Sequence, residues 1–355
     1  MTSSKHLVFT GSYAAAGQPG VSAFVFDSGA GTLTPCGDFD GILAPSFLAI
    51  HPTQPWLYAV SETSRGTDGT AGHVHALTFE RSGERVIFTP RNVQPSGGDW
   101  PCHLRLDPST NWLIVSNYGS GSAAVLPIQP DGLLGKACMH IQHHGHGADP
   151  ERQEKAHVHS AIFTPDGEYA ILADLGIDAL VLYRFDQGRL EKISENLTRP
   201  GAGPRHMLFH PNGRVLYVTN ELNGTLCVYD YANGRLDERD RLATLPGGFP
   251  QNLVADLHLS PAGDRLYVSN RGHNSLAVFA VTPEGQLTRL SVTDCGGNWP
   301  RNFAVAPDGH FILVANQYSG EIVSLSIRPE TGEIGEEMAR YPVPKAACVL
   351  FGPEI

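Results

Sequence analysis

Residues 201–226 read GAGPRHMLFHPNGRVLYVTNELNGTL. Within this segment we expect a short apolar strand at 207–209, a turn at 210–213 with the sequence HPNG, and a second strand at 215–219. Apolar alternation, a turn rich in Pro, Asn and Gly, and a run of β-branched and aromatic residues are the signals of a β-hairpin. The segment therefore predicts two antiparallel strands joined by a tight turn.

The same hairpin pattern occurs six times along the chain. Each copy carries a proline in its turn, and these prolines are Pro52, Pro108, Pro165, Pro211, Pro261 and Pro307. They lie 46 to 57 residues apart. A period of that length holds about four short strands, which is the content of one propeller blade. No segment shows a convincing helical period, so the predicted class is all-β.

The two ends of the chain together supply a seventh copy of the pattern. Residues 344–350 match the start of a repeat, while residues 7–12 and 21–27 match its second and third strands. Pairing of the last strand with the first ones would close the ring and leave no long unpaired sheet edge. The sequence thus predicts a seven-bladed β-propeller whose N- and C-terminal strands share one blade, with residues 1–355 as a single domain.

Composition and charge exclude several kinds of partner. The chain has a net charge of −11 and shows no basic patch of the kind that nucleic-acid binding normally uses. No segment resembles a membrane span or a signal peptide. The six cysteines show no CxxC spacing, and most lie among apolar strand residues, so reduced thiols are expected. We therefore expect a cytoplasmic protein with no nucleic-acid or membrane partner, and the oligomeric state stays open.

The repeat also predicts where functional side chains gather. Counting from each proline as zero, positions −6 and +10 are equidistant from the turn, so we expect them to lie opposite each other, about 4.5–5.5 Å apart. The innermost hairpins of a propeller surround its central channel, so these positions would ring one mouth of that channel. Their charged and imidazole members are His159, Arg205, Arg301 and Lys345 at −6, and Glu62, Glu221 and Arg271 at +10.

Several members of this ring suit the chemistry of an anionic substrate. The guanidinium groups of Arg205, Arg271 and Arg301 present planar forks of donors that match carboxylate or phosphate. The imidazole of His159 titrates near neutral pH and could act as a general base. Two structural roles stay open as well: Arg205 and Glu221 could form an ion pair across the strands, and His159 could bond a neighbouring carbonyl.

Side-chain amides and a second histidine complete the predicted ring. Asn220 occupies position +9 and Gln317 position +10, and both are candidates for substrate binding. Asn at +9 can also serve as a turn former that ends the strand. His157 lies two residues before His159 and is a further candidate for substrate binding.

A polar insertion precedes the strand that carries His159. Residues 140–157 hold five of the 16 histidines of the chain. No carboxylate or thiolate completes a metal-ligand pattern of known spacing there, so no metal site is predicted. The insertion could instead cover one face of the propeller.

Several segments resemble the lactonase-type seven-bladed propeller family, which includes the propeller 6-phosphogluconolactonases and the fungal 3-carboxy-cis,cis-muconate cyclases. They are GAGPRHMLFHPNG with the VTNELN that follows it, HVHSAIFTPDG, YVSNR and WPRNFAVAPDG. DPERQEKAHVHS and DLGID resemble the bacterial branch of that family. The resemblance covers essentially the whole chain, and GAGPRHM followed by NELN is its most specific part.

The resemblance implies hydrolysis or formation of a lactone at the channel mouth, without an organic cofactor. In the cyclase branch the proposed active-site residues are a His, an Arg, a Glu sixteen residues later and a further Arg. Arg205 and Glu221 have that spacing. His159 or His157 would supply the imidazole, and Arg271 the second guanidinium.

We therefore expect an enzyme whose partner is a small anionic sugar lactone, with 6-phosphogluconolactone as the first candidate for hydrolysis. His159 would activate water, while one or two of Arg205, Arg271 and Arg301 would hold the phosphate or stabilise the oxyanion. Glu221 would orient Arg205 or His159. Two alternatives stay open, a lactonising enzyme of the muconate cyclase type and a propeller that binds partners without catalysis.

Overall fold

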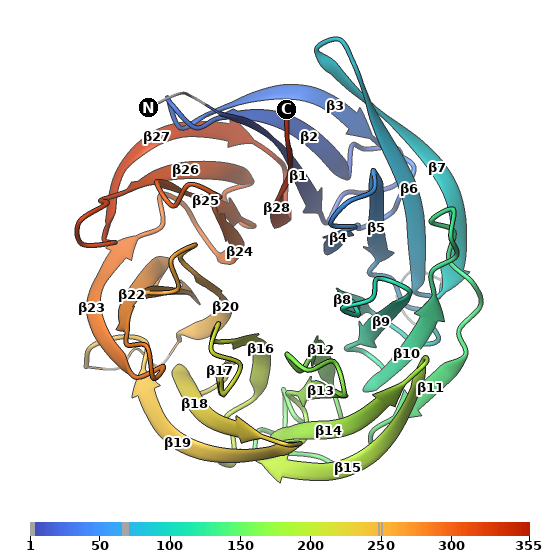
Figure 1. Ribbon diagram of the computed structural model, residues 1–355, viewed down its shortest axis with the longest axis vertical. Coiled ribbons are helices and arrows are strands. Elements are labelled where there is room, and N and C mark those ends of the chain that lie inside the picture. The colour runs from blue at the N-terminus through green and yellow to red at the C-terminus, as the bar shows by residue number, and fades with distance from the viewer. Residues whose placement is uncertain (1–3, 66–70, 248, 250) are drawn as a thin grey trace.

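The computed structural model describes residues 4–65, 71–247, 249 and 251–355. These residues form 28 strands in seven four-stranded antiparallel sheets. The sheets stand as blades around a common centre, and the innermost strand of each blade faces that centre (Figure 1). The predicted all-β, seven-bladed propeller is confirmed. The described residues hold no helix of the length and apolarity that crossing a membrane would need.

Six blades are each built from four consecutive strands, which run from the centre of the ring to its rim. They are β4 (Leu48–Ile50), β5 (Trp56–Ser61), β6 (His73–Ser82) and β7 (Arg85–Pro95); β8 (Pro101–Leu106), β9 (Trp112–Asn117), β10 (Ser122–Pro127) and β11 (Met139–Gln142); β12 (Val158–Phe163), β13 (Tyr169–Asp174), β14 (Ala179–Asp186) and β15 (Arg189–Leu197); β16 (Pro204–Phe209), β17 (Val215–Asn220), β18 (Thr225–Ala232) and β19 (Arg235–Ala243); β20 (Leu253–Leu259), β21 (Arg265–Arg271), β22 (Ser275–Val281) and β23 (Leu287–Asp294); and β24 (Pro300–Val305), β25 (Phe311–Asn316), β26 (Glu321–Ile327) and β27 (Ile334–Pro342).

The seventh blade joins the two ends of the chain. Its inner strand β28 (Ala346–Glu354) pairs antiparallel with β1 (Lys5–Ser12), which is followed outward by β2 (Val21–Asp27) and β3 (Thr32–Phe39). Both ends of the chain therefore lie in this blade (Figure 1). The predicted closure of the ring by strands from both termini is confirmed.

The hairpin of β16 and β17 shows why the repeated turn needs its residue types. Leu216 pairs with Phe209, and the chain reverses over 210–213. The Gly213 nitrogen donates to the His210 carbonyl at 2.9 Å, and Gly213 has a φ of +70°. Glycine adopts this left-handed conformation without a steric penalty, so it can close the turn. The predicted hairpin is confirmed.

The core lies between neighbouring blades. Tyr217 and Val228 of one blade pack with Val268 and Phe279 of the next, and all four side chains are buried. The Tyr217 hydroxyl also donates to the Gly285 carbonyl of that next blade at 3.0 Å. Burying a large apolar side chain contributes about 1.5–3 kcal/mol. The blades therefore form a rigid frame for the residues at the centre.

The inner strands share an irregularity at their first residues. In β16, Pro204 pairs with Asn220 and Met207 with Val218, so two residues of β16 face the single Thr219 of β17. Register shifts occur at the corresponding place in β8, β12, β20 and β24. Each is a β-bulge, which bends a strand and redirects a side chain.

The bulge corrects one geometric expectation. Positions −6 and +10 do not lie directly opposite each other, because the pairing of Phe209 with Leu216 centres the turn half a residue before position +2 and the bulge then adds one residue to the inner strand. The Glu221 nitrogen donates to the carbonyl of Gly203 at 2.7 Å, so Glu221 lies opposite Gly203 and not opposite Arg205. The prediction of direct opposition was wrong, because a residue count from the turn cannot register an extra residue in one strand.

Candidate active site

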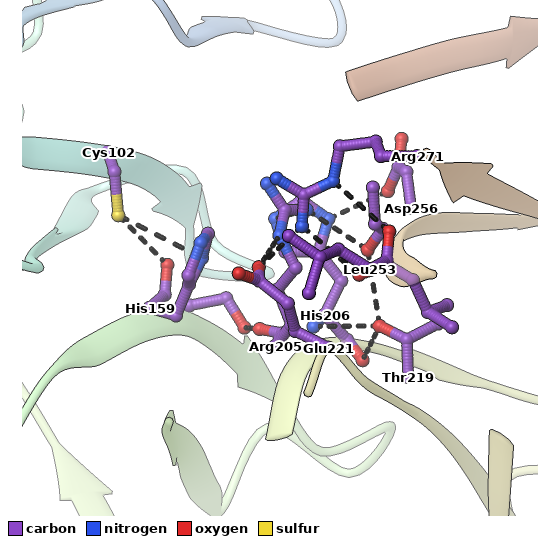
Figure 2. A network of polar contacts seen from close by, with 12 residues as sticks. Cys102, His159, Arg205, His206, Thr219, Glu221, Leu253, Asp256 and Arg271 are labelled. Atoms are coloured by element: carbon purple, nitrogen blue, oxygen red, sulfur yellow. Dashed lines mark hydrogen bonds and ion pairs between the residues drawn. The ribbon is translucent and has the colours of Figure 1, made fainter. Parts of the chain in front are cut away.

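Glu221 lies directly after β17 and accepts hydrogen bonds from three arginines. Its Oε2 lies 2.9 Å from Nε of Arg205 and 2.6 Å from Nη2 of Arg271, as Figure 2 shows. Its Oε1 lies 2.5 Å from Nη2 of Arg152. Burial on its own would raise the pKa of the Glu221 carboxyl, but Arg271, Arg205 and Arg152 together hold that pKa well below its ordinary value. Glu221 is therefore ionised at neutral pH.

Backbone carbonyls of β20 hold the two buried arginines. Arg205 donates from Nη1 to the Ala255 carbonyl at 3.0 Å. Arg271 donates from Nε to the Leu253 carbonyl at 3.2 Å, and its guanidinium lies 5.5 Å from the Trp299 ring centre. Burial, followed by the nearby charge of Arg271, lowers the pKa of Arg205 to about 10, although Glu221 opposes this shift. Arg205 stays charged at neutral pH.

A chain of hydrogen bonds leads from Arg205 toward the centre of the ring. Nη1 of Arg205 lies 3.2 Å from Nε2 of His206, and Nδ1 of His206 lies 2.7 Å from Oδ1 of Asp256 (Figure 2). An arginine can only donate, so Nε2 of His206 accepts and its Nδ1 carries the proton that Asp256 accepts. Burial, followed by the charge of Arg205, lowers the pKa of His206 to about 4.

His159 lies in the bulge of β12, beside Cys102. Its Nδ1 lies 3.9 Å from the Cys102 sulfur, and the Cys102 thiol donates to the His159 carbonyl at 3.3 Å. Burial, followed by the charge of Arg205, lowers the pKa of His159 well below its ordinary value, so the imidazole is neutral at pH 7. Burial raises the pKa of the Cys102 thiol. Cys102 therefore stays protonated and is a poor nucleophile.

Arg301 and Glu62 interact electrostatically at this end of the inner strands. The Arg301 guanidinium lies 5.2 Å from the Tyr13 ring centre. Glu62 accepts a hydrogen bond from the Tyr13 hydroxyl at 2.9 Å and another from the Ser46 hydroxyl. Burial raises the pKa of Glu62, and Arg301 offsets part of that rise. A carboxyl with a raised pKa is typical of functional sites; the repeat count placed Glu62 in the predicted ring but assigned it no role.

His157 lies apart from the arginine cluster. Its Nδ1 donates to the Tyr118 carbonyl at 2.8 Å, and its Nε2 lies 3.1 Å from Oε2 of Glu154. Its ring stacks on that of Tyr118 with 4.3 Å between the ring centres. Both nitrogens are thus engaged by the protein, and His157 fastens the end of the insertion to β9.

The two amide candidates differ in their surroundings. The Asn220 side chain turns into its own blade, where Nδ2 donates to Thr225 Oγ1 at 2.9 Å and contacts the Cys227 sulfur at 3.1 Å. Asn220 therefore fastens the loop between β17 and β18. Oδ1 of Asn220 and Oε1 of Gln317 are both buried without a hydrogen-bond partner in the described part of the chain, so the two residues differ only in that the Asn220 amide nitrogen is anchored.

Arg152 is the residue of the cluster that sequence reasoning missed. It belongs to the insertion at 140–157, which follows no repeat register, so the count from the turn prolines cannot place it. Its side chain is 35% exposed, against 4% for Glu221. The insertion therefore lies against this mouth, as expected for a segment that covers one face.

The other histidines of the insertion have structural partners or face solvent. His143 lies between Asp174 Oδ2 and the Tyr183 hydroxyl, with its ring nitrogens 2.8 Å from each. Oδ1 of Asp174 accepts the backbone N–H of His157 at 2.7 Å. Within the described ranges, no three His, Cys, Asp or Glu side chains come together as a metal site.

Asp178 holds the GAG segment that precedes Arg205. Its carboxylate accepts the N–H of Gly201 at 2.7 Å and that of Gly203 at 2.8 Å. Gly203 has a φ of +64°, and a Cβ there would lie 2.6 Å from Leu222 Cγ, so only glycine fits without strain. The Gly203 carbonyl in turn accepts from the backbone of Glu221. Asp178 thereby positions both strands that carry the ion cluster.

The charges at this mouth do not balance. Arg152, Arg205, Arg271 and Arg301 supply four positive charges, and the two carboxyl groups of Glu221 and Glu62 offset at most two of them, which leaves at least two. The whole chain has a net charge of −11, so the excess is local. A local positive field inside a negative protein attracts a small anion to that place.

Comparison with known proteins agrees with this arrangement. The model of the family described as lactonase, 7-bladed β-propeller, matches residues 7–351. The chain belongs to the seven-bladed lactonase propeller family. This match confirms the family resemblance inferred from the sequence motifs.

Relatives of this lactonase propeller cover nearly its whole length. The 6-phosphogluconolactonase of Bacillus subtilis is 32% identical over 351 residues and covers 98% of both chains. The 6-phosphogluconolactonase of Formosa agariphila is 33% identical over 89% of this chain and 90% of its own. The structure of the periplasmic gluconolactonase of Pseudomonas aeruginosa is 33% identical, covers 98% of this chain and 99% of its own, and superposes with a TM-score of 0.92. These similarities support lactone hydrolysis as the class of reaction.

Proposed function

We propose that this lactonase propeller hydrolyses 6-phosphogluconolactone to 6-phosphogluconate at the mouth that Glu221, Arg152, Arg205, Arg271 and Arg301 surround. The excess of two guanidinium charges over carboxylates carries the proposal. A phosphorylated lactone brings about two negative charges to that place, and guanidinium groups are well suited to phosphate. The relatives named 6-phosphogluconolactonase support the same substrate.

Arg301 holds the phosphate in this proposal. Arg205 and Arg271 share the carboxylate of Glu221, whereas the guanidinium of Arg301 lies over an aromatic ring and makes no direct ion pair in the part of the chain that the structure describes. A guanidinium without a bound carboxylate can give both arms of its fork to a phosphate oxygen pair. Arg301 is therefore the group at this mouth with the most donors to offer.

Arg205 and Arg271 stabilise the oxyanion that forms at the lactone carbonyl. The hydrogen bonds of Arg205 use Nε and Nη1, and those of Arg271 use Nε and Nη2. Nη2 of Arg205 and Nη1 of Arg271 remain as donors for the substrate. Donors that the fold already holds in place need no reorganisation during the reaction, which is the main source of such stabilisation. Glu221 acts through the two arginines and is a positioning residue.

His159 serves as the general base. The water oxygen bonds to the carbonyl carbon, and His159 takes the proton that the water loses. The ring C–O bond then breaks, and the same proton passes to the departing ring oxygen, so acid and alcohol are both formed. Burial and then the positive charges around it lower the pKa of His159; a bound anionic substrate opposes the effect of those charges, which strengthens the base when the lactone is present.

The remaining candidates have smaller roles. The Gln317 oxygen, which lacks a donor in the described residues, suits a sugar hydroxyl. His157 and Asn220, proposed from the sequence as substrate ligands, act indirectly, by fastening the insertion and the loop after β17. The proposed reaction uses side chains alone and no organic cofactor.

We further propose that residues 1–355 form one domain that works in the cytoplasm. All six cysteines are free in the structure, which agrees with a reducing compartment. The gluconolactonase of Pseudomonas aeruginosa is periplasmic. Fractionation of cells that produce the chain at its natural level would locate it directly.

A comparison of two lactones tests the proposed substrate. Rates with 6-phosphogluconolactone and with δ-gluconolactone are measured for the wild type, for Arg301→Gln and for Arg91→Gln, an exposed residue of β7 that serves as control. We expect Arg301→Gln to lower kcat/KM about 30-fold for the phosphorylated lactone, near 2 kcal/mol for a charge-assisted contact, and less than threefold for δ-gluconolactone. Equal losses with both lactones would contradict the role of Arg301. Turnover of 3-carboxy-cis,cis-muconate instead of either lactone would identify the cyclase reaction.

A further inference from the structure

A cavity lies at the end of the inner hairpins away from the arginine cluster. It has a volume of about 510 Å³, and the turn prolines Pro52 and Pro108 line it, whereas Glu221 lies at the opposite end of its hairpin. Its walls come from β4, β8, β20, β24 and β28, the inner strands of five blades. These strands surround the centre of the ring (Figure 1). The cavity is therefore central and opens at the mouth away from the arginine cluster.

Arg105 of β8 lines this cavity and has no counter-ion. Its guanidinium makes no hydrogen bond or ion pair in the part of the chain that the structure describes. Asp107, which also lines the cavity, accepts bonds from the turn after β8, and Asp256 accepts from His206 and His258. The Arg105 side chain is exposed at the cavity opening, and a guanidinium stays charged at neutral pH. Without a carboxylate of its own, its planar fork of donors is free to bind an anion that enters the cavity.

Two histidines add polar groups to the same cavity. Nδ1 of His103 is buried without a hydrogen-bond partner in the described residues, and its ring packs 4.6 Å from that of Phe47. The side chain of His258 is 39% exposed, and its Nε2 lies 2.9 Å from Oδ2 of Asp256. An unsatisfied buried polar atom calls for an explanation, and a bound ligand is one.

The rest of the wall is apolar. Its apolar residues are Phe47, Leu48, Ala49, Ile50, Leu104 and Leu106 on one side, with Cys348, Val349 and Leu350 on the other. A site with one cation, a few polar atoms and an apolar wall fits a ligand with one anionic group on an apolar body. A free phosphate would leave this wall uncovered.

We propose that the cavity binds a small organic carboxylate with an apolar body, anchored by Arg105. The carboxylate accepts two parallel hydrogen bonds from the guanidinium, and the body lies against Phe47 and the strands β4 and β28. This site is separate from the proposed lactonase site, because His206 and Asp256 lie between the Arg205 end and His258. The proposal does not depend on the reaction at the other mouth.

Binding of 4-fluorobenzoate, followed by fluorine NMR of the ligand, tests the proposal with the full chain. We expect saturable binding to the wild type, a dissociation constant at least tenfold higher for Arg105→Met, and a smaller change for Arg105→Lys. Arg91→Met removes one charge from the exposed face of β7 and serves as the matched control. Melting temperatures show that each variant is folded.

Competitors and a variant of the other mouth distinguish the alternatives. Unlabelled benzoate should displace the probe, while benzyl alcohol and inorganic phosphate at the same concentration should not. Arg301→Gln should leave the dissociation constant unchanged. The proposal is overturned if the wild type shows no saturable binding, if Arg105→Met binds as the wild type does, if phosphate competes as well as benzoate, or if Arg301→Gln alone abolishes binding.

Discussion

Nη2 of Arg152 lies 2.5 Å from Oε1 of Glu221, so an ion pair ties the insertion at 140–157 to the end of β17 across 69 positions of sequence. Arg152 is the most exposed arginine bound to this carboxylate. It therefore contributes one of the positive charges that an entering anion meets first. The insertion, which lies outside the repeat, completes the proposed site.

Removal of this arginine should weaken the proposed reaction without unfolding the protein. We predict that Arg152→Met lowers kcat/KM for 6-phosphogluconolactone about tenfold, mainly through a higher KM, because one charge-assisted contact is worth about 1.5 kcal/mol or more. Steady-state kinetics of Arg152→Met, compared with those of the control Arg91→Met, test this prediction. Unchanged kinetics would show that Arg152 only covers Glu221.

Glu221 should matter for stability as well as for activity. Glu221→Gln leaves Arg205 and Arg271 buried without a counter-charge, and breaking a buried ion pair in this way costs about 3–5 kcal/mol. The matched control is Glu337→Gln, since Glu337 pairs with Arg340 at the surface, where such pairs are worth about 0–1 kcal/mol. Urea unfolding measures both. If Glu221→Gln lowers the free energy of unfolding as little as the control does, the inference that the ion cluster stabilises the fold is contradicted.

The buried histidines predict that stability falls on acidification. The pKa of His206 is about 4 in the folded protein, below the ordinary value near 6.5. Between pH 6.5 and pH 4 the unfolded chain binds a proton that the folded chain excludes, so the free energy of unfolding decreases as pH falls, by roughly 3 kcal/mol for this group. Urea unfolding at pH 7 and pH 5 should show the loss, and His206→Gln should show a smaller one. Identical pH dependence in the variant would contradict the assignment.

The lowered pKa of His159 also predicts how kcat/KM depends on pH. Because the pKa of His159 lies well below 6.5, the base is already neutral in the free enzyme, so kcat/KM should stay flat from pH 8 to pH 6 after subtraction of spontaneous hydrolysis. A decline with a midpoint near 6.5 would contradict His159 as a base with a lowered pKa. If Glu62→Gln removed such a decline, the proton transfer would belong to Glu62, whose pKa is raised.

The architecture could be predicted from the sequence because the blade is a local unit. Pro211 and Gly213 mark a turn whose chemistry depends on a few neighbouring residues, and the spacing of such turns gives the period. The pairing of β28 with β1 followed from the same pattern at the two chain ends. Because the turn motif repeats, it predicts not only single hairpins but also the number and arrangement of the blades.

The site could be predicted only in part. The repeat count brought Arg205, Glu221 and Arg271 to one mouth, and the structure joins them. The repeat count could not predict the bulge in β16, because the spacing between turn prolines does not reveal an extra residue within one strand. Nor could it place Arg152, whose contact with Glu221 depends on how an insertion folds back.

The most direct test of the proposed lactonase is the hydrolysis of freshly made 6-phosphogluconolactone, read by coupling the product to 6-phosphogluconate dehydrogenase. The wild type should accelerate ring opening well above the spontaneous rate, and His159→Gln and Arg205→Ala should each lose at least 100-fold in kcat/KM, as expected for a general base and an oxyanion donor. No acceleration by the wild type, or full activity in both variants, would contradict the proposal.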